Sequence, residues 1–252
     1  MPHFTPSRLL ERQVNITLVG CGGNGSQMLT GLARLNHALV ALGHPGLQVT
    51  VWDDDIVSEA NIGRQLFSRA DVGQSKSAVL TSRINHFFGT TWISEPRRFN
   101  CSTHTSLLIL CVDSAAARRK IYRKSLPQGH HWYVMDVGNR AADGQVLFGE
   151  WIARGRMPDS PSIDHVPLPD PFQLLPELID ITAPEDDAPS CGLAVALERQ
   201  ELFINQAVVT PALAILWEFF RYGRLTWHGA FINLRTGSTR PLPVQESPSG
   251  LQ

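Results

Sequence analysis

The stretch that decides the fold of this chain is Leu18-Val-Gly-Cys-Gly-Gly-Asn-Gly-Ser26. It ends the apolar run Val14–Val19, which predicts a buried parallel strand. It opens onto Ser26–Leu42, where apolar residues recur at helical spacing, and Leu47–Trp52 then predicts a second strand. Strand, glycine loop, helix and strand together predict a βαβ unit.

The loop has the spacing Gly-x-Gly-x-x-Gly at Gly20, Gly22 and Gly25. Glycine lets the backbone turn tightly and approach phosphate oxygens. The following helix presents free N–H groups and the positive end of its dipole to an anion. The loop therefore predicts a nucleotide site, and a tight strand-to-helix turn without a ligand is the structural alternative.

Polar residues behind the loop indicate which nucleotide binds. Asp53 ends the second strand, where a carboxylate accepts hydrogen bonds from ribose, and Asp55 belongs to the same acidic triplet. Arginine binds phosphate through paired hydrogen bonds, and lysine supplies a compact charge. A cluster of such donors favours a triphosphate held for attack at its α-phosphorus over a cofactor for hydride transfer. Its members are Asn61, Arg64, Gln65 and Lys76.

A further acidic residue, Asp113, follows the apolar run Leu107–Val112, which predicts another strand. Ligands of open α/β sheets bind at this carboxyl edge, and a carboxylate beside a triphosphate is typical of a Mg²⁺ ligand. A second role, compatible with the first, is to cap the helix predicted to begin near Ala115.

The whole pattern predicts an α/β fold: a Rossmann-like, open, mainly parallel sheet with helices on both faces, extended by C-terminal antiparallel strands. Segment 155–190 holds eight prolines and eight acidic residues against one arginine, and it predicts a long crossover loop. The other predicted elements are helices over Ser75–Phe88, Ala115–Leu126, Leu193–Asn205 and Val208–Tyr222, a strand over Trp132–Val137, and a hairpin of Phe231–Arg235 with Thr239–Val244.

We expect one domain over residues 1–252. It comprises a nucleotide-binding half at 13–150, the crossover loop at 155–190, and C-terminal helices and a hairpin at 191–245.

The composition limits the possible partners. The 252 residues are 43% hydrophobic, and the net charge of −1 gives no electrostatic case for nucleic acid or membrane. The short basic clusters Arg97-Arg98 and Arg118-Arg119-Lys120 are predicted to be solvated. Four cysteines without a Cys-x-x-Cys pair give no support for zinc, and with no signal peptide they predict a reducing, cytoplasmic setting.

These ordered motifs resemble the ThiF/MoeB/HesA superfamily, the E1-like enzymes that activate ubiquitin-like and sulfur-carrier proteins. Roughly half of the chain carries the resemblance, through the loop Gly20–Ser26, Asp53-x-Asp55-x-Val57-Ser58-x-x-Asn61-x-x-Arg64-Gln65, Val72-Gly73-x-x-Lys76 and Asp113. More narrowly, the chain resembles the ThiF-family component of the PRTRC system of bacterial plasmids and integrating elements. That resemblance lies in Gly43-His-Pro-Gly-Leu-Gln-Val-Thr-Val51, Pro189-Ser-Cys-Gly-Leu-Ala194 and Phe231-Ile-Asn-Leu-Arg-Thr236.

The resemblance implies ATP-dependent adenylation of the C-terminal carboxylate of a small β-grasp protein, with release of pyrophosphate. It assigns ribose to Asp53 and magnesium to Asp113, and it adds Gly23 and Ser26 to the nucleotide loop. It assigns the phosphates to Asn61, Arg64 and Lys76, with support from Gln65. It also implies a homodimer in which Arg8 or Arg12 reaches the ATP of the other subunit.

The cysteines mark a departure from many relatives, which carry two zinc-binding Cys-x-x-Cys pairs. Some relatives pass the activated carboxyl to a catalytic cysteine. Cys191 is the candidate here, because it precedes a predicted helix whose N-terminus favours a thiolate; a packing role is the alternative. Cys21 and Cys111 lie in the loop and in a predicted buried strand, and they are expected to be structural.

Two other functions stay open on sequence grounds. An NAD-dependent oxidoreductase would use the glycine loop, but it leaves Asn61, Arg64 and Lys76 unexplained, and the chain has no Tyr-x-x-x-Lys pair. A non-catalytic nucleotide-binding scaffold is the other, and the intact set of Arg64, Lys76 and Asp113 argues against it.

Overall fold

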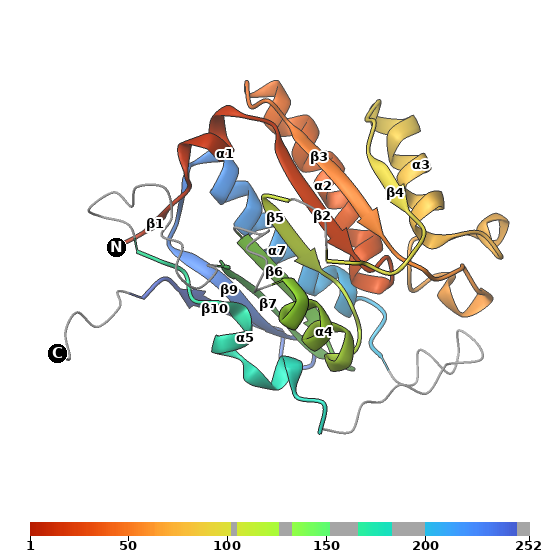
Figure 1. The fold of residues 1–252 in the computed structure, drawn as a ribbon. Coiled ribbons are helices and arrows are strands. Elements are labelled where there is room, and N and C mark those ends of the chain that lie inside the picture. Colours follow the sequence, from red (N-terminus) through yellow and green to blue (C-terminus); the bar gives the residue numbers. More distant parts are fainter. Residues whose placement is uncertain (102–104, 126–132, 152–165, 183–199, 246–252) are drawn as a thin grey trace.

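One eight-stranded sheet of order β10-β9-β7-β6-β5-β2-β3-β4 runs through the molecule (Figure 1). The computed structural model describes residues 1–252 apart from 102–104, 126–132, 152–165, 183–199 and 246–252. The half around the glycine loop is parallel throughout. Its strands are β2 (Val14–Val19), β3 (Leu47–Trp52), β4 (Ile93–Glu95), β5 (Leu107–Leu110) and β6 (Tyr133–Asn139).

The other half of the sheet is antiparallel. β7 (Asp143–Glu150) pairs with β6 and then with β9 (Trp227–Asn233), and β9 forms a hairpin with β10 (Ser238–Pro243). The predicted closing hairpin is therefore confirmed, and so is the fold class. Sequence patterns missed β4 and β7. β4 is short and partly exposed, and β7 begins with Asp143 and Gly144, residues that are poor in strands.

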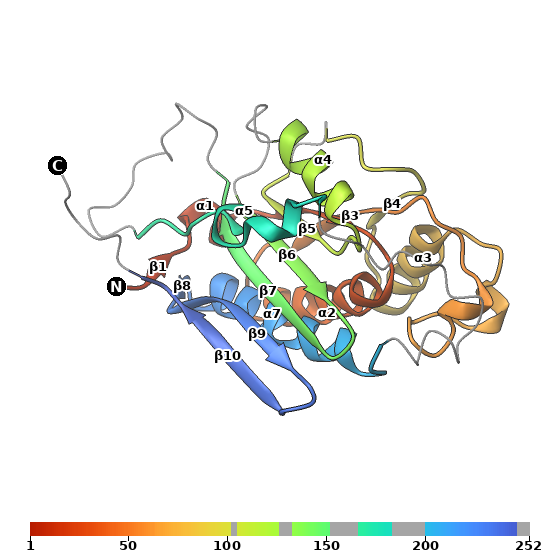
Figure 2. The ribbon, with the colours of Figure 1, turned by 90° about the horizontal axis from the view of Figure 1, so that it is seen from below.

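Helices cover both faces of the sheet (Figure 2). One face packs on α2 (Gly23–Ala41), α3 (Lys76–Phe88) and α7 (Ile204–Arg221). The opposite face packs on α4 (Ala115–Ser125) and α5 (Pro171–Leu174), and the 3₁₀ turn η4 (Pro176–Ile179) follows α5.

The central strand β5 is apolar throughout because its side chains alternate between two cores. In β5, Leu107 and Ile109 face the core of α2 and α7, whereas Leu108 and Leu110 face the core of α4 and α5. All four side chains are buried. A sheet covered on both faces brings ligand-binding loops to the carboxyl ends of its parallel strands.

Two predictions for the C-terminal half are wrong where the structure describes them. The predicted break between two helices does not occur, because α7 runs continuously over Ile204–Arg221, while Gln200–Phe203 is not helical. The remainder of the predicted Leu193–Asn205 helix lies outside the described residues. The crossover segment also contains α5, because the Oδ1 atom of Asp170 accepts a hydrogen bond from the Phe172 N–H at 2.8 Å and Phe172 is buried.

Short elements lie at the amino ends of the parallel strands. β1 (His3–Phe4) pairs with β8 (Arg224–Leu225), and α1 (Ser7–Glu11) follows β1. None of the helices in the described part of the chain is both long and apolar enough to cross a membrane.

Candidate functional site

The glycine loop is held by its own tight packing between β2 and α2. Gly20 has φ +93°, and its N–H donates to the carbonyl oxygen of Trp52 at 2.9 Å. A Cβ on Gly20 would lie 2.7 Å from the carbonyl oxygen of Cys111, and one on Gly25 would overlap the carbonyl oxygen of Gly20. These two glycines therefore build the turn itself, as the sequence predicts.

Gly22 and Gly23 serve two different purposes. A Cβ on Gly23 would overlap the side-chain amide of Asn205, so this glycine makes room for α7. A Cβ on Gly22 would meet only the Nε2 atom of Gln65, at 4.0 Å. Gly22 is also the N-cap residue of α2, where free N–H groups point out of the helix. The open approach to the helix N-terminus is therefore at Gly22.

Asp53 ties the glycine loop to the end of β3. Its Oδ2 atom accepts a hydrogen bond from the Cys21 N–H, and its Oδ1 atom accepts one from the Asp55 N–H at 2.8 Å. Burial raises the pKa of this carboxyl, and the two backbone hydrogen bonds act in the opposite direction. Each carboxylate oxygen keeps a second lone pair, so Asp53 can also accept from a ribose hydroxyl.

Lys76 lies at the start of α3 with its side chain only 9% exposed. Its Nζ atom is 2.8 Å from the Oδ2 atom of Asp55, whose side chain is 66% exposed. Its charge also lowers the pKa of Asp53, which places the ammonium group beside the loop anchor. Asp55 is thus the ion-pair partner of Lys76 in this structure.

Ser26 and Asn61 hold the segment that carries Arg64. The Oγ atom of Ser26 accepts from the Leu66 N–H at 3.3 Å and donates to the carbonyl oxygen of Gly23 at 3.2 Å. The Oδ1 atom of Asn61 accepts from the N–H and hydroxyl of Ser58, at 2.8 and 3.1 Å. Among the described residues, none forms a hydrogen bond with the amide nitrogen of Asn61.

Arg64 and Gln65 each have a buried polar atom without a hydrogen-bond partner among the described residues. The Nη1 atom of Arg64 donates to the Oε1 atom of Gln200 at 2.5 Å, and burial lowers the pKa of the half-buried guanidinium. Three buried atoms of the glycine loop and of the Arg64–Gln65 segment make no hydrogen bond to any residue that the structure describes. They are Asn24 Oδ1, Arg64 Nε and Gln65 Oε1.

Asp113 is brought close to the loop because the preceding residues, Cys111 and Val112, lie against Gly20. The hydroxyl of Ser114 accepts from the Ala117 N–H at 3.2 Å, so Ser114 rather than Asp113 caps α4. The carboxylate of Asp113 is exposed and forms no hydrogen bond or ion pair within the described ranges.

The structure also contains a buried ion pair that the sequence did not predict. Arg118 donates from Nε to Asp136 Oδ2 at 2.7 Å, and the side chains are 7% and 0% exposed. The prediction of a solvated face is therefore wrong for Arg118, although Arg97 and Arg98 are exposed, at 64% and 80%. Burial raises the pKa of Asp136, and Arg118 opposes that rise. The available signal was an acid inside the apolar run Trp132–Val137.

The other residues singled out in the sequence are the cysteines and two N-terminal arginines. Burial raises the pKa of both Cys21 and Cys111, which keeps these thiols protonated as expected of structural cysteines. Cys191 lies outside the described residues. Arg8 interacts electrostatically with Tyr133 at the opposite end of the sheet, and Arg12 is exposed.

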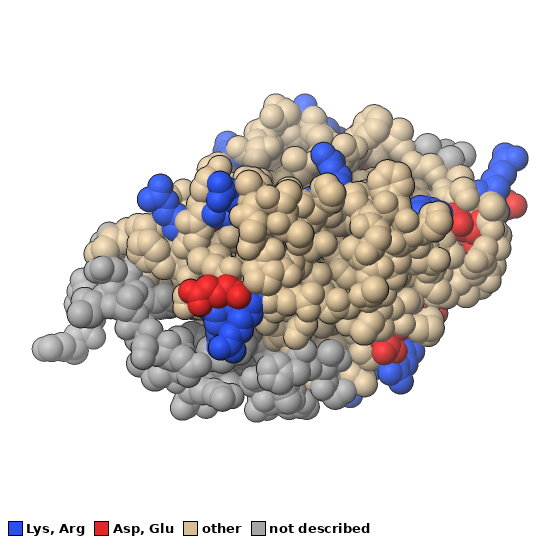
Figure 3. Space-filling view, turned by 90° about the horizontal axis from the view of Figure 1, so that it is seen from above, with Lys and Arg blue, Asp and Glu red and all other residues tan. Residues whose placement is uncertain are grey.

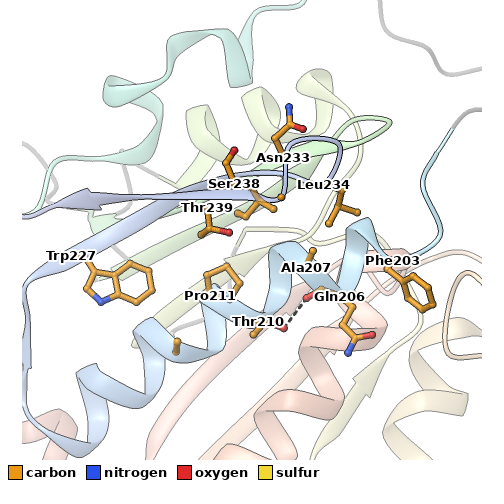
Figure 4. A pocket seen from close by; sticks show the side chains of 13 residues that line it. Phe203, Gln206, Ala207, Thr210, Pro211, Trp227, Asn233, Leu234, Ser238 and Thr239 are labelled. Atoms are coloured by element: carbon orange, nitrogen blue, oxygen red, sulfur yellow. Dashed lines mark hydrogen bonds between the residues drawn. The ribbon is translucent and has the colours of Figure 1, made fainter.

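Other surface features of the molecule lie apart from the predicted site. A hollow of about 610 Å³ lies between α7 and the β9–β10 hairpin (Figure 4), and small residues such as Ala207 and Ala214 open it. None of the predicted site residues lines it. On the face in Figure 3, Lys and Arg side chains are dispersed rather than gathered in a patch. No group of three or more His, Cys, Asp or Glu side chains in the described segments could hold a metal ion.

Comparison with solved structures identifies the fold. The chain is similar to crystal structures of E. coli MccB with succinimide (15% identity, TM-score 0.58), with MccA (16%, 0.58) and with ATP (15%, 0.54). The matches cover 94%, 96% and 94% of this chain and 65%, 67% and 64% of the MccB chains. The chain thus spans about two thirds of the length of MccB, with the same E1-like adenylation fold. No curated protein matches the sequence.

The family assignment comes from the sequence itself. The profile of the ThiF family matches residues 8–150, more than half of the 252-residue chain. This range contains the glycine loop, the anchor Asp53, the phosphate-site candidates and Asp113. The protein therefore belongs to the ThiF family.

Proposed function

We propose that this protein is an ATP-dependent activating enzyme that adenylates the C-terminal carboxylate of a small β-grasp partner. Membership of the ThiF family and the fold shared with MccB support this class of activity. MccB itself has been crystallised with ATP and with MccA.

The observation that carries the proposal is a set of buried polar atoms on residues of the predicted nucleotide site and its loop: Asn24 Oδ1, Arg64 Nε and Gln65 Oε1 have no partner within the described residues. Leaving such an atom unsatisfied costs about 1–3 kcal/mol. Such atoms call for an explanation, and a ligand that supplies the missing partners is the one we propose here. The open space at Gly22 and the charges of Arg64 and Lys76 favour a polyanionic ligand.

The proposed chemistry needs no general base, because a C-terminal carboxylate is already ionised at neutral pH. A carboxylate oxygen forms a bond to the α-phosphorus of ATP. The bond from that phosphorus to the bridging oxygen breaks, and pyrophosphate leaves with the electron pair. Arg64, Lys76 and the amide of Asn61 hold the phosphates and offset the charge that develops on the leaving oxygens.

Asp53 and Asp113 complete the assignment. Asp53 binds the ribose through its remaining lone pairs, and Asp113 holds magnesium. Magnesium usually keeps several waters and phosphate oxygens as ligands, so one protein carboxylate fits it. The bound ion would neutralise phosphate charge during the displacement.

The finer parts of the proposal follow the resemblance. They are a PRTRC-type mobile-element system, a cytoplasmic homodimer, and Cys191 as acceptor of the activated carboxyl. The arginine that reaches the second subunit is Arg8 or Arg12.

The first test is thermal unfolding with Mg-ATP and with NAD, each at about 100 times its dissociation constant. A bound ligand then stabilises the native state by roughly 2.7 kcal/mol. We expect the shift with Mg-ATP only, and we expect Lys76→Ala to abolish it. Lys120→Ala, which removes an exposed lysine of α4, is the matched control and should retain the shift.

Catalysis is tested by pyrophosphate–ATP exchange with a panel of β-grasp proteins that end in glycine. The wild type should exchange with one of them, and Lys76→Ala should lower the rate by about 100-fold or more. ATP binding without exchange across the panel would instead favour the non-catalytic scaffold. A shift with NAD alone would contradict the proposal.

A further inference from the structure

The short segment Gln200–Asn205 contacts the nucleotide site at two separate points. Gln200 accepts a hydrogen bond from Arg64, which lies 136 residues earlier in the chain. Asn205, in the first turn of α7, packs its side-chain amide onto Gly23. Both contacts join the C-terminal half of the chain to the glycine-loop half, and neither residue belongs to the motifs of the ThiF resemblance.

The contact with Gln200 fixes the direction of the Arg64 side chain. A guanidinium is planar, with five N–H donors in a rigid arrangement. Holding Nη1 on Gln200 Oε1 at 2.5 Å therefore restrains the whole guanidinium, Nε included. That Nε atom is buried and has no partner in the described part of the chain. Arg64 therefore has one restrained donor, Nε, that no described residue accepts from.

The side chain of Asn205 packs against Gly23, in the first turn of α2. The side chain is 3% exposed, and its Nδ2 atom has no hydrogen-bond partner among the described residues. The Oδ1 atom of the neighbouring Asn24 is unpartnered in the same sense, while its Nδ2 atom donates to the carbonyl oxygen of Val137 at 3.3 Å. Two buried amides with an unpartnered atom therefore belong to the first turn of α2 or pack on it at Gly23.

We propose that Gln200 and Asn205 are positioning residues of the triphosphate site. Gln200 sets the guanidinium of Arg64, and Asn205 holds the glycine loop at Gly23 in the conformation that receives phosphate. The nucleotide site is then not complete within residues 13–150 and forms only when the segment before α7 packs on it. This inference rests on the ATP binding of the proposed function.

A double-mutant cycle on Mg-ATP affinity tests the role of Gln200, using calorimetric titration of wild type, Gln200→Ala, Arg64→Ala and the double variant. Gln200→Ala should weaken binding about tenfold in the wild-type background and not at all in the Arg64→Ala background. An equal loss in both backgrounds would overturn the role. Gln206→Ala, which alters an exposed residue of α7, is the control and should bind like the wild type.

Asn205 is tested with two variants, so that a folding defect in one does not remove the test. Asn205→Ala should weaken Mg-ATP binding by roughly fivefold, and the nearly isosteric Asn205→Asp should weaken it more, because it adds a negative charge beside the phosphate site. Wild-type affinity in a folded Asn205→Asp protein would overturn the role. If the wild type itself does not bind Mg-ATP, the proposed function fails, and this inference fails with it.

Discussion

The two ends of the parallel strands bury similar polar side chains and satisfy them differently. At the amino ends, the ring of His3 is 2.8 Å from the carbonyl oxygen of Val166 and 3.0 Å from the hydroxyl of Tyr133. Glu150 Oε2 there accepts from the Leu168 N–H at 2.8 Å. At the carboxyl ends, amide atoms of Asn24, Gln65 and Asn205 are buried without a partner among the residues described.

The contrast separates buried polar groups that are paired within the fold from buried polar atoms that the proposed ligand would pair. A satisfied buried hydrogen bond contributes about 0.5–1.5 kcal/mol to stability, whereas an unsatisfied buried group lowers stability by about 1–3 kcal/mol. The paired groups at the amino ends are therefore expected to stabilise the protein without affecting nucleotide binding, and the unpaired atoms at the carboxyl ends to affect binding without stabilising the protein. Three predictions test this difference between the two ends, and they are given in decreasing order of the expected change in free energy.

The largest effect is expected within the glycine loop itself. Gly25→Ala places a methyl group on the carbonyl oxygen of Gly20, and we expect it to cost more than about 4 kcal/mol of unfolding free energy. Gly22→Ala meets no close neighbour, so it should fold and lose Mg-ATP affinity instead. Urea unfolding and ATP titration of the two variants measure both quantities. A Gly22→Ala protein with wild-type ATP affinity would contradict the assignment of the open approach.

The next effect is a pH dependence at the amino ends. Burial raises the pKa of Asp170 from 3.8 to about 6. Because the folded protein holds this proton more tightly than the unfolded chain, the stability that Asp170 contributes is fully present below about pH 4. It is lost as the pH rises through about 6, by up to roughly 3 kcal/mol.

Asp170→Asn removes that titration and can still accept the capping hydrogen bond from the Phe172 N–H. Urea unfolding of both proteins at pH 4.5 and pH 8 measures the difference. We expect the wild type to lose more stability than the variant between these pH values. Equal losses in the two proteins would show that Asp170 does not hold a proton in the fold.

The smallest effect is expected when one polar group at the amino ends of the parallel strands and one at their carboxyl ends are removed in turn. Tyr133→Phe removes the hydroxyl that pairs with His3 and should cost about 1–2 kcal/mol of stability while ATP affinity stays at the wild-type value. Gln65→Met replaces a buried amide, whose Oε1 atom has no partner among the described residues, with an apolar side chain of similar size, so stability should stay constant or rise while ATP affinity falls. Thermal unfolding and ATP titration measure both effects. The contrast between the two ends is wrong if Gln65→Met destabilises the protein as much as Tyr133→Phe does.

Much of the fold was predictable because local patterns were strong. Val14–Val19, Leu47–Trp52 and the glycine loop predicted the βαβ unit, and the structure has β2, α2 and β3 at those places. β7 was not predictable in this way, since Asp143–Glu150 has polar ends and becomes a strand by pairing with β6 and β9. α7 was split in the prediction although no glycine or proline interrupts Asn205–Val208.

The candidate site divides in the same manner. The chain order of Asp53, Arg64, Lys76 and Asp113 indicated a triphosphate, because charge and hydrogen-bonding capacity are properties of the residue types themselves. The burial of Lys76 and Arg118 could not be read from sequence, since exposure depends on which elements pack around a side chain.

The sequence alone was enough to predict the α/β fold class and the glycine turn and to favour a triphosphate as the ligand, because periodicity, backbone freedom and charge are local properties. Only the tertiary structure decided that Gly23 makes room for Asn205, that Gln200 holds Arg64, and that Arg118 pairs with Asp136. Each of those contacts joins residues far apart in the chain. Such contacts depend on the packing of whole helices and strands, which no short segment of sequence specifies.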